Sequence, residues 1–129
     1  MQVSDKLVIV LWSCGPDRPG GAQLAAAPFV YALAARALEI EVEMHFTAST
    51  VRWLFEGVAG AAFTDHARNK TVLDYVRETK AAGVKLYACA MAINEHRCGA
   101  ALIAEAEGIA GAATVIGATV QPNVRTLVF

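Results

Sequence analysis

A cysteine between a buried strand and a helix is the residue of this sequence best placed to do chemistry. The apolar run Val84–Cys89 is typical of a buried strand, and Ala90–Arg97 is helical in composition. Cys89 is therefore expected at the carboxyl end of a strand, where an open α/β sheet forms its ligand crevice. The amides of a helix start favour a thiolate, so Cys89 is predicted to attack or to carry sulfur. The alternative is that Cys89 is a small buried hydrophobic residue of the core without a chemical role.

Three more residues are candidates for binding in the same crevice. Cys14 lies just after the first apolar run, and Cys89 lies at the end of the run Val84–Cys89. If the two predicted strands are neighbours in the sheet, both thiols open onto the same crevice. Gly15 begins a glycine-rich loop that is expected to form a wall of the crevice. This loop lacks the G-x-G-x-x-G and P-loop motifs. His45 ends the second predicted strand and is expected to overhang the crevice.

The other cysteine and histidines give only weak indications of a disulfide or a metal site. Cys98 lies nine residues after Cys89, which on one unbroken helix is about 900° and places the two on opposite sides. His96 and Cys98 lack a second ligand pair at metal spacing. His66 and His96 are expected to be solvated. We therefore predict no bound metal and no cofactor.

Length and composition bound the class of protein. The 129 residues, 56% hydrophobic and 18% charged, predict a single domain over 1–129 that buries further surface in a homo-oligomer. A net charge of −1, without any basic block, argues against a nucleic-acid partner. Only six apolar residues follow Lys6, too few for a signal peptide or a membrane span. The three cysteines, an odd number, argue against a disulfide framework. The chain is therefore predicted to be a cytoplasmic protein with reduced thiols.

Strands and helices are predicted to alternate, as they do in mostly parallel sheets. The expected strands are Lys6–Trp12, Ile40–Phe46, Val84–Cys89, Ala112–Gly117 and Val124–Phe129. The expected helices are one that starts or kinks at Pro28, then Thr50–Val58, Thr71–Ala82, Ala90–Arg97 and Ala100–Glu107. These elements predict an α/β fold: one three-layer domain with a mostly parallel five-stranded sheet and helices on both faces.

The second strand alternates apolar and polar residues, which predicts one exposed face. We therefore expect this strand at a sheet edge or at a subunit interface. Glu39, Glu41 and Glu43 are expected to form a solvated face and not an acid/base pair.

The order and spacing of several segments resemble the DsrE/DsrF-like (YchN-like) family of small sulfur-transfer proteins. The distinctive segment is Leu86–Ala92, which is similar to the family's strand-to-helix cysteine segment. The other similar segments are Gly15-Pro16 with Gly20, Phe29–Ala35, Met44–Phe46 with Val51, and Val124–Phe129. The resemblance implies a flavodoxin-like sheet and a homotrimer or hexamer. It also implies that Cys89 accepts a persulfide from a donor protein and passes sulfur to an acceptor protein.

Two other functions stay open from the sequence. One is a non-catalytic homo-oligomeric module for small-ligand binding or assembly. The other is a thiol redox protein that pairs Cys89 with Cys14. The resemblance leaves open whether the chain is an enzyme, a sulfurtransferase, or a stoichiometric relay.

Overall fold

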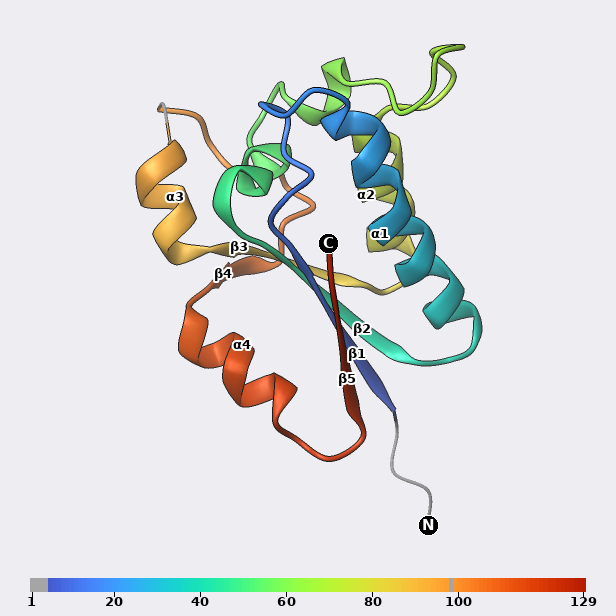
Figure 1. Ribbon diagram of the computed structural model, residues 1–129, viewed down its shortest axis with the longest axis vertical. Helices are drawn as coiled ribbons and strands as arrows, with labels where there is room; N and C mark the ends of the chain where they lie inside the picture. The colour runs from blue at the N-terminus through green and yellow to red at the C-terminus, as the bar shows by residue number, and fades with distance from the viewer. Residues whose placement is uncertain (1–4, 98) are drawn as a thin grey trace.

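The architecture is a parallel sheet with helices on both faces, seen in a computed structural model that describes residues 5–97 and 99–129 (Figure 1). The strands are β1 (Lys6–Leu11), β2 (Glu41–Phe46), β3 (Lys85–Cys89), β4 (Gly108–Ala110) and β5 (Val124–Val128). The helices are α1 (Gly21–Ala37), α2 (Val72–Ala81), α3 (Ala90–His96) and α4 (Ala112–Thr119), with the short 3-10 helices η1 (Ala48–Leu54) and η2 (Ala59–Ala61).

The strand order places the helices in two layers. The order is β4-β3-β2-β1-β5 and every pair is parallel. The chain steps in one direction from β1 to β4 and then returns to the far side of β1. Because such crossovers are right-handed, α1 and α2 cover one face and α4 lies over the other (Figure 1). The predicted α/β fold with helices on both faces is confirmed.

The hydrophobic core lies between the sheet and the α1–α2 layer. Alternate residues of the central strands point into it, among them Leu11, Phe46 and Leu86, which are fully buried. Phe29 of α1 contacts Phe46, with ring centroids 6.0 Å apart, and stacks on Tyr75 of α2 at 5.9 Å. This core fixes the positions of the strand ends.

Two predictions for the chain after α3 were wrong. Ala112–Gly117 was predicted as a strand but lies in α4, because a short apolar run has no periodicity that separates the two and its alanines favour a helix. The fourth strand is Gly108–Ala110, paired with β3. The predicted helix Ala100–Glu107 is absent; its backbone bonds to other segments, for example Glu107 N–H to the Leu86 carbonyl at 2.7 Å.

Three further predictions differ from the structure. Helix α1 begins at Gly21 and contains Pro28, so a start at the proline is wrong, whereas a kink there stays a prediction. The helix predicted at Thr50–Val58 is the 3-10 helix η1. The second strand is not at a sheet edge, because β2 lies between β1 and β3, and the alternative of a subunit interface stays a prediction.

Candidate functional site

Cys89 is the last residue of β3 and the residue that precedes α3. Its backbone is extended (φ −69°, ψ 127°), and its thiol is free and half-buried. Cys89 pairs in register with Ala110 of β4. The predicted junction of strand and helix is therefore present, at the carboxyl edge of the sheet.

A small apolar cavity of about 150 Å³ lies at this edge, between the strand ends and α4. It is lined by His45, Thr47, Cys89, Ala110, Gly111, Ala112, Val115 and Ile116. The polar side chains among these are the imidazole, the hydroxyl and the thiol. Drug-sized ligands occupy clefts of about 300–1,000 Å³, so this cavity suits a very small group.

The cavity joins Cys89 to a buried charged network on the same sheet face. His45 is buried, and its Nε2 lies 3.0 Å from Oε1 of Glu43. The other carboxylate oxygen of Glu43, Oε2, lies 2.9 Å from Nζ of Lys6. The ring of Tyr87 stacks on the imidazole, with centroids 5.2 Å apart and planes 15° apart. Side chains from three adjacent strands therefore hold His45 in place.

The ion pair keeps Glu43 and Lys6 charged. Burial on its own raises the pKa of Glu43, but the hydrogen bonds with His45 and Lys6 outweigh burial and lower that pKa. The hydrogen bond with Glu43 raises the pKa of Lys6. Because an ionised carboxylate only accepts hydrogen bonds, Nε2 of His45 must be the donor.

Cys14 and Gly15 do not line this cavity. The condition for a shared crevice, that the strands before Cys14 and Cys89 are neighbours, is not met because β2 separates β1 from β3. Cys14 is 3% exposed, and burial raises the pKa of its thiol to about 11. Gly15 packs so closely on Ser49 that a side chain would overlap the serine hydroxyl. The structure thus brings Cys89 and His45 together and places the other two candidates elsewhere.

The remaining candidates give no metal site in the part of the chain that the structure describes. Among residues 5–97 and 99–129, no three His, Cys, Asp or Glu side chains gather in a way that would hold a metal ion. His66 is exposed and His96 is half-buried. Cys98 lies outside the described residues, so the structure says nothing of its proposed pairings.

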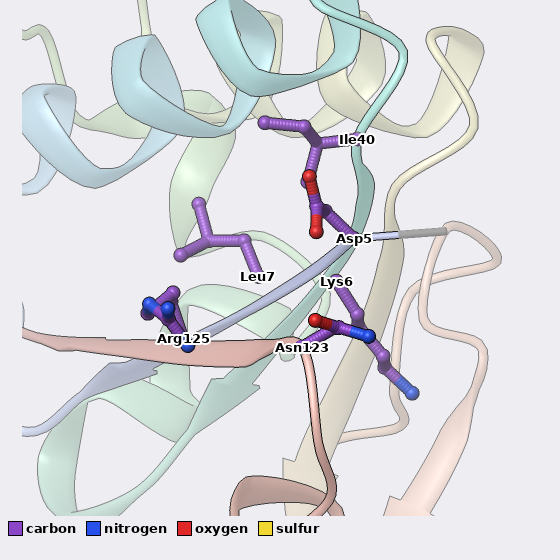
Figure 2. Close-up of a pocket in the computed structure, with 6 residues that line it drawn as sticks. All are labelled: Asp5, Lys6, Leu7, Ile40, Asn123 and Arg125. Atoms are coloured by element: carbon purple, nitrogen blue, oxygen red, sulfur yellow. The ribbon is translucent and has the colours of Figure 1, made fainter. Parts of the chain in front are cut away.

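A larger cavity of about 250 Å³ lies at the opposite, amino end of β1 and β5 (Figure 2). It is lined by Asp5, Lys6, Leu7, Ile40, Asn123 and Arg125, whose side chains come from strand starts and turns. These residues offer charge but no thiol or imidazole. The candidate residues Cys89 and His45 line the smaller cavity.

Glu43 was expected on a solvated face, and that prediction was wrong. Glu43 is 9% exposed because the strand that carries it is central. One signal was present: Glu43 and His45 are two residues apart in a strand, so they share a face. Glu39 and Glu41, by contrast, are exposed as predicted.

Comparison with known proteins identifies a family and a fold. The model of the DsrE/DsrF-like family matches residues 13–127. The crystal structure of the YchN protein from E. coli superposes with a TM-score of 0.74, covering 97% of this chain and 99% of that one at 16% identity. The search of curated proteins found no match. Among the described residues, no helix is long and apolar enough to cross a membrane.

Proposed function

Because the chain belongs to the DsrE/DsrF-like family, which is related in general to sulfur relay, we propose that it carries sulfur as a persulfide on Cys89. The partners are a donor protein and an acceptor protein. The observation that supports this most is the half-buried Cys89 thiol in a small apolar cavity at the carboxyl edge of the sheet. Such a cavity accommodates one extra sulfur atom and excludes a bulky substrate.

The proposed transfer needs two thiol exchanges. The Cys89 thiolate attacks the outer sulfur of a donor persulfide; a new S–S bond forms, the donor's S–S bond breaks, and the donor leaves as a thiolate. An acceptor thiolate then attacks the outer sulfur on Cys89, and Cys89 leaves as a thiolate. No external oxidant or reductant is consumed. The apolar wall from Ala110 to Ile116 supports this function because it disfavours entry of charged reductants.

We also infer that the protein is a homo-oligomer, a trimer or hexamer, in which a second copy covers α4. This helix has no buried residue, although it is apolar on all sides. Ile116 is 61% exposed and Val120, just after the helix, is 71% exposed. Helices that are apolar all round are normally buried, and exposed apolar patches mark interaction sites. The expected compartment is the cytoplasm, where free thiols persist.

The same cavity favours one alternative, a module that binds a very small ligand without chemistry at Cys89. Its apolar lining fits such a ligand as well as it fits a persulfide. The redox alternative has less support, because Cys14 is buried on the core side and does not line the cavity.

Intact-protein mass spectrometry after incubation with polysulfide or a loaded cysteine desulfurase tests the proposal. We expect a gain of about 32 Da that reduction removes. The Cys89→Ser variant is expected to show no gain. A folded wild-type protein without this gain would favour the ligand-binding module.

A further inference from the structure

The apolar cavity contains a second group that can take part in the reaction of Cys89, the imidazole of His45. We propose that His45 accepts the proton of the Cys89 thiol and that Glu43 acts as the positioning residue that orients His45. This inference rests on the proposed function for its substrate, but its geometry depends only on β1, β2, β3 and the cavity.

The register places His45 and Cys89 as diagonal neighbours. His45 pairs with Tyr87, and Cys89 lies two residues further along β3 on the same face. With strands about 4.8 Å apart and about 3.3 Å per residue, the two Cα atoms are about 8 Å apart. Both side chains line one cavity of about 150 Å³. Water occupies about 30 Å³ per molecule in the liquid, so the cavity also has room for a bridging water.

The hydrogen bonds of His45 determine which ring nitrogen is available. Nε2 donates to the ionised Glu43, so Nδ1 carries the lone pair in the neutral ring. Within the described residues, the structure gives Nδ1 no hydrogen-bond partner. Every fully buried side-chain nitrogen or oxygen in these residues has a partner, so Nδ1 is not fully buried. Nδ1 therefore reaches accessible space, and the space that His45 lines is the cavity of Cys89.

Charged and titratable groups face His45 from three adjacent strands. On its own strand the neighbour is Glu43, and β1 contributes Lys6, which is paired with that carboxylate. Strand β3 contributes Tyr87 in the stack and Lys85, which is exposed and pairs in register with Glu43. Strand β4 and helix α4 carry no titratable side chain. The carboxylate of Glu43 is therefore the charged group that contacts the imidazole, and it accepts the Nε2 hydrogen bond.

The proton balance of the transfer follows directly. The S–H proton of Cys89 moves to Nδ1, directly or through water, and leaves a thiolate beside an imidazolium. The thiolate attacks the outer sulfur of the donor persulfide, and the donor's S–S bond breaks. The departing thiolate takes the proton from Nδ1. Throughout, Nε2–H stays bonded to Glu43, which never needs to be protonated.

The test is the rate at which iodoacetamide alkylates Cys89, measured by peptide mapping against pH. An unassisted thiol is only a few per cent thiolate at about pH 7, so we expect His45→Gln to lower the rate there about tenfold. Glu43→Gln is expected to lower it several-fold, and the rates of all variants are expected to converge above about pH 9.5. Glu41→Gln, an exposed glutamate on the same strand, is the matched control and should leave the rate unchanged.

The double variant separates positioning from a general structural effect. If Glu43 acts through His45, Glu43→Gln has no further effect in the His45→Gln background. Equal pH profiles for folded wild type and Glu43→Gln, or additive effects in the double variant, would overturn the proposal. Imidazole nitrogen NMR of the wild type gives a check that needs no variant: an Nδ1–H tautomer for neutral His45 would also overturn it. Because alkylation requires no sulfur donor, a failure to load persulfide would leave this result standing.

Discussion

Glu43 and His45 lie two residues apart on one face of β2, with Oε1 of the carboxylate 3.0 Å from Nε2 of the imidazole. The strand is central, so both side chains are buried, and Lys6 completes the pair from the neighbouring strand. An ionised carboxylate in such a place must be paired and hydrogen-bonded to be tolerated. This relationship links the stability of the fold to the protonation of one side chain.

We predict that Glu43→Gln destabilises the protein by about 1–2 kcal/mol at neutral pH, the size of a charge-assisted hydrogen bond. The native contacts lower the pKa of Glu43, so this stabilisation is present above the unfolded-state pKa and is lost as pH falls through the lower, native value. Urea unfolding at about pH 7 and below about pH 4 should show the difference shrinking in acid. A difference that grows in acid would contradict the assignment. Glu41→Gln is the exposed control.

The thiol of Cys14 is predicted to be inert in the folded protein. Burial raises its pKa to about 11, so at about pH 8 it is almost entirely protonated as well as inaccessible. Brief treatment with N-ethylmaleimide followed by peptide mapping should leave the Cys14 peptide unmodified. The same peptide should react fully in urea. Rapid labelling of Cys14 under native conditions would show that the first loop opens.

The parts of the fold that the sequence predicts are those with local signals. The apolar runs of β1 and β3 and the amphipathic α2 each carry their own pattern, so their positions agree with the structure within a residue or two. The strand end at Cys89 follows from this. Helix α4 has no such pattern, because its apolar residues surround the whole helix.

The rest of the site depends on which strands are neighbours, which no local pattern contains. The alternation of β2 predicts a polar face, but only the strand order shows that this face is buried and meets Lys6. The same order separates Cys14 from Cys89. His45 was predicted at the crevice because it ends its strand. The burial of Glu43 beside Lys6 could not be predicted in this way, because it depends on which strands are neighbours.

The indole of Trp53 holds the loop after β1 in place. Its Nε1 donates to the carbonyl of Cys14 at 2.8 Å, and the side chain is 1% exposed. Trp53→Phe leaves that carbonyl without its donor, so we predict a loss of about 1–3 kcal/mol in the free energy of unfolding. Trp12→Phe, at a residue that is 58% exposed, should change it by less than about 0.5 kcal/mol. Similar effects of the two substitutions in urea titrations would contradict this role.

A charge on α4 is predicted to break the homo-oligomer. Ile116→Asp places an unpaired carboxylate in the interface that we infer over this helix, where its burial is costly. Light scattering after size-exclusion chromatography should give an oligomer for the wild type and a smaller species for the variant. Ala81→Asp, at an exposed position of α2, is the control and should not change the mass. An unchanged mass for Ile116→Asp would exclude α4 from the interface.

The position of the carried sulfur tests the central claim most directly. After loading with polysulfide, trapping of the persulfide with iodoacetamide and digestion, mass spectrometry should find the additional sulfur on the Cys89 peptide. Cys14→Ala should load as the wild type does, whereas Cys89→Ser should carry no sulfur. Sulfur on another cysteine, or loading that survives Cys89→Ser, would contradict the assignment of Cys89 as the carrier.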